Sequence, residues 1–220
     1  MGVLENLAKK ANEALKNESD KVKQETIDAL KSNGREIVDD LKHSAKEKIE
    51  KAAKEKKKKF KFDEIPSSLK ELKEYDIADL QDEFGVAALV VMALNAYAED
   101  EEAGKEMLDF LNGPTEFKKS DASFINDRFM DGKSYVVKSY FEGTDPEDDY
   151  ETDKYVIKVS SNEYSYEEEN YCKLYLESSG ADSPRHITLR KKPSTGQWFV
   201  WDYRALLADV KLPASLDEWA

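Results

Sequence analysis

Two stretches of the sequence combine residue types that bind ligands. The first is a lysine run broken by phenylalanine, and it defines a candidate interaction patch: Lys56, Lys57, Lys58, Lys59, Phe60 and Lys61. Clustered cations beside an aromatic ring suit phosphate groups or a membrane interface. The alternative is structural, with Lys56–Lys59 ending a helix where cations favour the negative end of its dipole, and with residues 60–62 extended. We expect the structural role.

The second stretch is "GQWFVWDYR", residues 196–204, which reads as a strand with two apolar sides. Alternation places Trp198 and Val200 on one side, and the candidate aromatic docking surface Phe199, Trp201 and Tyr203 on the other. This second side is either a recognition groove or a surface covered by the N-terminal helix or by residues 207–220. We expect it to be covered. Aromatic and basic residues on an open sheet also stack single-stranded bases, but the charge distribution described below disfavours nucleic acid.

Residues with catalytic or metal-binding potential are sparse. His43, His186 and the single cysteine, Cys172, cannot build a histidine–cysteine metal set or an activated nucleophile. The acidic stretch 142–153 fails as a calcium loop, because Tyr150 stands where the turn needs glycine and Val156 where a bidentate glutamate belongs. We therefore predict no catalytic, cofactor-binding or metal residues, and no enzyme activity.

Charge is unevenly distributed along the 220 residues, which carry a net charge of −13. Residues 1–61 hold 17 basic and 12 acidic side chains, which leaves 17 basic and 35 acidic ones for the rest. The larger part should repel nucleic acid and anionic membranes, whereas the N-terminal part could be drawn to them. Nucleic acid is therefore not an expected partner.

The N-terminal segment has an eleven-residue apolar period, seen at Leu4, Leu15, Thr26 and Ile37. Eleven residues over three turns keep the stripe nearly straight on a helix. The period predicts a basic amphipathic helical segment over residues 1–61, continuous or kinked near 33–34, where Asn33 and Gly34 suit a helix end. Its stripe would pack on itself, on another copy as in a coiled coil, or on the rest of the chain.

The Ala, Lys and Glu composition of residues 43–59 resembles the eleven-residue repeats of late-embryogenesis-abundant and apolipoprotein-like helices. Residues 1–59 as a whole, which share the eleven-residue period, resemble the same helices. This resemblance implies a helix that lies on membranes or pairs with a partner.

The rest of the chain has the pattern of one α+β domain, residues 66–220. Helices are expected at 67–75, 76–100, 101–114 and 120–132, and the all-apolar stretch Phe84–Leu94 must be buried. Five strands are expected at 133–143, 153–161, 171–179, 185–193 and 196–204. Their connections are too short for helical crossovers, so we expect a mainly antiparallel five-stranded sheet under the helices.

Alternation also assigns the two faces of the sheet. The buried face should hold Ile157, Val159, Cys172, Leu174, Leu176, Ile187 and Leu189. The water-facing side should hold Lys158, Tyr171, Lys173, Tyr175, Thr188 and Arg190. Cys172 is thus predicted to be an inert core thiol.

The stretch "WFVWDYRALLADVKLP", together with "DEWA" at 217–220, resembles the end of an uncharacterised bacterial domain family. The resemblance covers roughly residues 66–220 and implies one folded unit, but it assigns no activity. No secretory signal is apparent, the longest apolar run is too short to cross a bilayer, and one cysteine fits a reducing compartment. We expect a cytoplasmic protein.

Two functional hypotheses remain. The first is a non-enzymatic binding or scaffolding protein that uses its N-terminal helix to contact another copy, a protein partner or a membrane surface. The alternative is an acidic immunity or inhibitor-type protein that binds a basic partner. We prefer the first because it accounts for both the segregated charge and the eleven-residue period.

Overall fold

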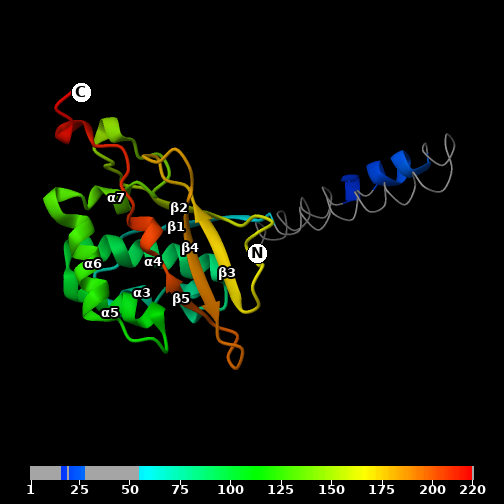
Figure 1. Ribbon diagram of the computed structural model, residues 1–220, viewed down its shortest axis with the longest axis horizontal. Coiled ribbons are helices and arrows are strands. Elements are labelled where there is room, and N and C mark those ends of the chain that lie inside the picture. Colours follow the sequence, from blue (N-terminus) through cyan, green and yellow to red (C-terminus); the bar gives the residue numbers. More distant parts are fainter. Residues whose placement is uncertain (1–15, 19, 28–54, 220) are drawn as a thin grey trace. The chain divides into compact units, whose positions relative to one another are not determined.

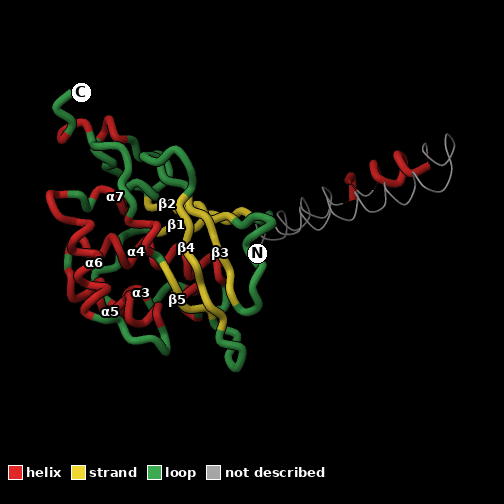
Figure 2. Tube along the Cα trace, in the orientation of Figure 1, coloured by secondary structure: helices red, strands yellow, loops and turns green. Residues whose placement is uncertain are grey.

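The computed structural model describes residues 16–18, 20–27 and 55–219 (Figures 1 and 2). The chain divides into two compact units, residues 1–53 and residues 54–220. In the first unit, residues 16–18 and 20–27 are helical, and the Thr26 hydroxyl donates to the carbonyl of Val22 at 2.7 Å. The predicted continuity or kink at 33–34 lies outside the described residues, as do Leu4, Leu15 and Ile37.

The second unit contains the predicted five-stranded antiparallel sheet. Its strands follow one another in the spatial order β1-β2-β3-β4-β5. They are β1 (Lys57–Phe62), β2 (Tyr155–Ser160), β3 (Tyr171–Leu176), β4 (Arg185–Lys191) and β5 (Trp198–Asp202). Four of the five predicted strands are confirmed, and the α+β class is confirmed with them.

The fifth strand comes from the lysine run. The prediction that Lys56–Lys59 end the N-terminal helix is wrong, because Lys57–Phe62 forms edge strand β1, paired with β2. Phe60 and Phe62 alternate with lysines, so one side of the strand packs on the core while the other faces water. Lysines on an edge strand also discourage pairing with other sheets.

The predicted strand at 133–143 is the other error. Residues Tyr135–Lys138 form the short helix α7, and only Phe141 forms an isolated bridge, to Ile157 of β2. The reason is that Tyr135, Val136 and Val137 are all buried. Burial at consecutive positions suits a helical turn better than a strand with one face in water.

Helices lie in all four predicted regions, but the region 76–100 is divided at Leu80 into a 3₁₀ turn and a helix. Besides α7, the second unit contains the following helices and 3₁₀ turns. They are α3 (Leu69–Leu72), η1 (Asp76–Asp79), α4 (Glu83–Glu99), α5 (Glu101–Asn112), α6 (Lys119–Phe129), η2 (Met130–Gly132), η3 (Pro146–Asp148), η4 (Arg204–Leu207) and η5 (Ala214–Leu216). Asp82 caps α4 by accepting from the backbone N–H of Phe84. Asp100 ends α4 and caps α5.

Helix α4 is the centre of the core. Every residue from Phe84 to Tyr97 is buried, and the helix contacts all five strands. Within the second unit, helices α3, α5, α6 and α7 lie on the same side of the sheet as α4 (Figure 1). The opposite face of β3, β4 and β5 is therefore left open, and it carries the predicted polar and aromatic residues.

Candidate functional site

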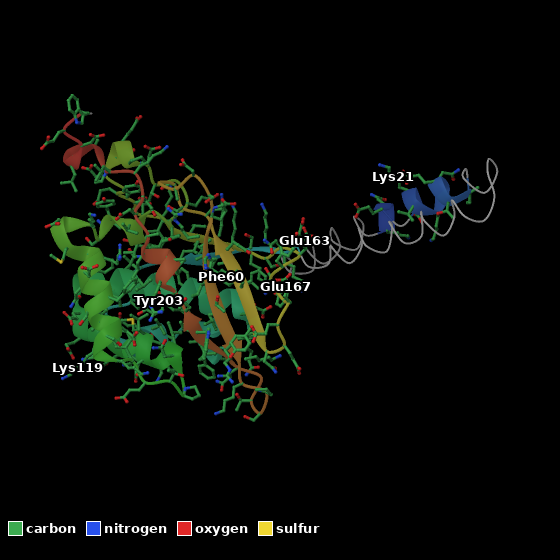
Figure 3. The ribbon with its side chains drawn as sticks, in the orientation of Figure 1. Lys21, Phe60, Lys119, Glu163, Glu167 and Tyr203 are labelled. Carbon is green, nitrogen blue, oxygen red and sulfur yellow. The ribbon has the colours of Figure 1, made fainter. Side chains whose placement is uncertain are left out.

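The lysine patch predicted from the sequence is partly neutralised by the body of the protein. Lys58 Nζ lies 2.7 Å from Asp82 Oδ1 and 4.8 Å from the centre of the Phe84 ring. Lys59 Nζ lies 2.8 Å from Glu142 Oε1. All five lysines of the patch are exposed, Lys58 and Lys59 included, whereas Phe60 (labelled in Figure 3) packs against the core. The six residues therefore do not form one unneutralised surface.

Glu142 links the two strands at this edge of the sheet. Strand pairing sets Lys59 opposite Lys158, and Glu142 accepts from both ammonium groups. These hydrogen bonds hold the pKa of the Glu142 carboxyl below its usual value. Lys158 also pairs with Glu177, at 3.2 Å. The charges around Lys59 thus stabilise the attachment of β1.

The boundary between the two units, after residue 53, changes the charge that is assigned to the N-terminal segment. Residues 54–61 hold six lysines and one glutamate, whereas residues 1–53 hold 11 basic and 11 acidic side chains. The basic character predicted for residues 1–61 therefore comes from β1 and the residues just before it. The first unit is electrically balanced.

The buried face of the sheet is as predicted. Ile157, Val159, Cys172, Leu174, Leu176, Ile187 and Leu189 are all buried. Burial raises the pKa of the Cys172 thiol, which keeps it protonated and unreactive. In the described ranges, no group of three or more His, Cys, Asp or Glu side chains is placed to hold a metal ion.

The open face carries a compact cluster of Tyr171, Arg190 and Trp201. The Arg190 guanidinium lies 5.4 Å from the Tyr171 ring centre and 5.2 Å from that of Trp201. The two rings meet edge to face, with centroids 5.5 Å apart. Trp201 remains 53% exposed although it makes these contacts. Neighbouring strands thus hold a large aromatic side chain in place at the surface.

The predicted aromatic docking surface is not formed as a unit. Tyr203, labelled in Figure 3, is buried, with 7% of its surface exposed, because β5 ends at Asp202 and the chain then turns into η4. Its burial raises the pKa of the hydroxyl. Phe199 is half-buried against Gly113, where an added Cβ would clash with its ring. Trp201 is the member of the three that stays open.

One of the two predicted covers for this side of β5 is the segment 207–220, and its described residues do not cover Trp201. Lys211 and Ser215 instead contact the 145–150 loop, where the Tyr150 hydroxyl donates to the carbonyl of Lys211 at 2.6 Å. The backbone N–H of Ser215 donates to Asp149 Oδ1 at 2.9 Å. Residues 207–219 therefore leave Trp201 open.

A hollow of about 250 Å³ and one of about 270 Å³ both include Trp201 in their walls. We call the larger one the Trp201 groove. It is lined by Asn112, Pro114, Thr115, Arg190, Lys191, Lys192, Pro193, Phe199, Val200 and Trp201. Three cations and no carboxylate line it, although residues 54–220 hold 36 acidic and 23 basic side chains. The groove is thus a cationic and aromatic site on an acidic body.

Trp201 is predicted as part of a docking surface and Arg190 as a water-facing residue, but no local pattern predicts that the two lie together. Lys191 and Lys192 are not among the predicted site residues. Arg190 pairs with Phe199 across β4 and β5, and this register brings the basic end of β4 beside Trp201. The only hint in the sequence was the run "RKKP" ahead of the aromatic strand.

These features define an α+β domain with one sheet face under α4 and the other open around a cationic, aromatic groove. Residues 64–214 match the family described as Domain of unknown function (DUF6935), and the chain belongs to this family. The predicted resemblance to an uncharacterised domain family is thereby confirmed. The match begins after β1, so the lysine strand lies outside it. Neither curated proteins nor solved structures gave a match.

Within the described ranges, no helix combines the length and apolar character needed to cross a membrane. The resemblance of residues 1–59 to eleven-residue-repeat helices stays a prediction.

Proposed function

We propose that residues 54–220 are a non-enzymatic binding module that holds an acidic peptide segment of a protein partner in the Trp201 groove. The exposure of Trp201 carries this proposal. Tryptophan and arginine dominate the energetics of protein interfaces, and here the two are packed together on an open face. Their mutual contacts fix the ring before any ligand arrives, which lowers the entropic cost of binding.

The lining of the groove favours an anionic and partly apolar ligand. Arg190, Lys191 and Lys192 supply positive charge, and Phe199 and Trp201 supply apolar surface. Among the described residues, no carboxylate lines this groove, and those of Glu116, Asp121 and Asp202 line the adjoining hollow that also includes Trp201. A volume of about 270 Å³ is below the roughly 300–1,000 Å³ of typical small-molecule sites. An open hollow of this size suits one or two side chains of a peptide rather than a whole cofactor.

The net charge of the module argues against nucleic acid. Residues 54–220 carry 13 more acidic than basic side chains, from 36 and 23, and a polyanion would be repelled by most of this surface. A short acidic segment meets only the local cations. The groove therefore selects a small acidic element within a protein.

The N-terminal segment adds a second contact in this proposal. Its amphipathic period favours self-association or a protein partner. Peripheral membrane contact has less support now that residues 1–53 hold equal numbers of basic and acidic side chains. We place the protein in the cytoplasm, because its single thiol is buried and free, as expected in a reducing compartment.

Fluorescence anisotropy with the full chain tests this proposal. The probes are a labelled peptide with two acidic residues beside a tryptophan, the same peptide with lysines in place of the acids, and a labelled single-stranded DNA. We expect the acidic peptide to bind, and its affinity to fall about tenfold or more in Trp201→Ala and in Arg190→Glu. Tyr164→Ala is the matched control, because Tyr164 is an equally exposed aromatic residue, at 58%, outside the groove.

Two results would contradict the proposal. One is acidic-peptide binding that Trp201→Ala leaves unchanged. The other is a preference for the lysine peptide, which would support the acidic inhibitor-type alternative, or for the DNA, which would make the open face a base-stacking surface.

A further inference from the structure

We propose that the Trp201 groove is occupied by a second copy of this chain, which contributes its Asp217–Trp219 segment. The inference rests on the proposed function of the groove, and it adds the identity of the partner. Its starting point is Trp219, whose side chain is 94% exposed and follows two consecutive acidic residues, Asp217 and Glu218.

The segment that precedes Trp219 also exposes apolar surface. Leu212 and Leu216 are each about half exposed, at 49% and 48%. Exposed apolar side chains that gather along one segment mark an interaction site more often than scattered ones do. The backbone N–H of Trp219 donates to Asp217 Oδ1 at 2.9 Å, so a local turn holds the carboxylate close to the tryptophan.

The base of this segment is fixed to the body. The backbone N–H of Lys211 donates to the carbonyl of Gly180 at 2.8 Å, and the Tyr150 hydroxyl donates to the carbonyl of Lys211. Asp149 accepts from the backbone of Ser215. These contacts hold residues 211–215, so the exposed Asp217–Trp219 segment extends from an anchored base.

The two surfaces are complementary in charge and in chemistry. The groove offers three cations with no acid, and the segment offers two acids with no base. An indole placed over Arg190 and against Trp201 gains cation–π and aromatic contacts. Other surfaces of the chain are less suitable docking sites for this segment, because most of them are acidic and would repel Asp217 and Glu218.

Docking within one copy is opposed by the fold. The red C-terminal segment and the orange β4–β5 hairpin lie at opposite ends of the sheet (Figure 1). The hydrogen bonds of Lys211 and Ser215 would have to break for the segment to reach the groove of its own chain. Two copies can instead exchange segments reciprocally, which gives a closed dimer with two identical contacts.

Sedimentation velocity on the full chain tests the inference through complementation. Trp201→Ala removes the aromatic wall of the groove and Trp219→Ala removes the aromatic residue of the segment, and neither side chain belongs to the buried core, so both variants should still fold. We expect each variant alone to dimerise about tenfold or more weakly than the original chain. A mixture of the two should recover association, because it retains one intact groove and one intact segment. The double variant should not recover in any mixture, and Tyr164→Ala should dimerise normally.

Several outcomes would overturn the inference. They are a monomeric original chain, association that all variants share equally, as expected for the N-terminal segment, and the absence of recovery in the mixture. A labelled peptide of residues 210–219, titrated into the Trp219→Ala chain, separates the two proposals. If this peptide fails to bind while the generic acidic peptide binds in a Trp201-dependent manner, the second-copy inference is wrong and the proposed function stands. If neither peptide binds, both are wrong.

Discussion

Lys59 and Glu142, 83 positions apart, form a two-pronged ion pair, with Lys59 Nζ at 2.8 Å from Oε1 and 3.0 Å from Oε2 of Glu142. The pair joins the edge strand β1 to the loop that follows α7. Lys158 shares the same carboxylate, so Glu142 neutralises two lysines that strand pairing sets side by side. The lysine run is therefore an integral part of the sheet.

The Glu142 contact predicts a pH-dependent contribution to stability. Because the folded protein lowers the pKa of Glu142, the contribution is complete above the pKa of an unfolded glutamate, about 4.3, and is lost as the pH falls through the lower folded value. Glu142→Gln should thus lower the melting temperature at pH 7 and have much less effect near pH 3. Glu167→Gln, at an exposed carboxylate, is the control. An equal loss at both pH values would show that the ion pairs do not matter.

Truncation tests whether β1 belongs to the domain. A chain shortened to residues 54–220 should unfold cooperatively, close to the original midpoint, because it keeps every described strand. A chain that begins at Asp63 loses β1 and the buried Phe62 side chain, and should be less stable by at least about 3 kcal/mol. Urea denaturation followed by circular dichroism measures both. Equal stability of the two shortened chains would mean that β1 is dispensable.

Gly113 supports the groove from below and tolerates no side chain. It has a φ of +61° and lies under the Phe199 ring. Gly113→Ala should therefore lower the free energy of unfolding by at least about 2 kcal/mol, and Gly132→Ala by about 1 kcal/mol. Gly132 is the matched control, because its φ is +76° and its Cβ would meet nothing within 4 Å. Similar losses of unfolding free energy in the two variants would show that contact with the Phe199 ring does not add to the cost at residue 113.

The anchor of residues 211–219 depends on Tyr150. Tyr150→Phe removes the hydrogen bond to the Lys211 carbonyl and should cost about 1 kcal/mol. Hydrogen exchange measured by mass spectrometry should rise in residues 211–219 and stay unchanged in α4. Tyr164→Phe, at an exposed tyrosine, should change neither quantity. Uniformly faster exchange in Tyr150→Phe would indicate global destabilisation instead of a local anchor.

Alternation of apolar residues predicted the interior of the sheet well. Ile157, Cys172 and Leu189 lie on the buried face because strands with one face in water must follow a period of two. The all-apolar composition of α4 likewise indicated a helix buried on most sides. These features depend on local patterns, which a sequence contains directly.

The remaining features depend on contacts between distant segments. Residues 60–62 were predicted to be extended, but Lys57–Lys59 were assigned to a helix because they continue the composition of the residues before them, and only pairing with β2 makes them part of a strand. Tyr203 was assigned to the open side because nothing local shows that β5 ends at Asp202. The groove needs the register of β4 on β5, which places Arg190 beside Trp201.

The most direct test of the groove uses the indole N–H signals of the three tryptophans in a ¹H–¹⁵N spectrum of the full chain. Trp201→Phe and Trp219→Phe assign the signals, and Trp198, which is buried, is the internal reference. On titration with the generic acidic peptide, the signal of Trp201 should shift progressively and saturate, while that of Trp198 stays in place. A Trp201 signal that does not move while backbone signals of other surfaces do would contradict the account.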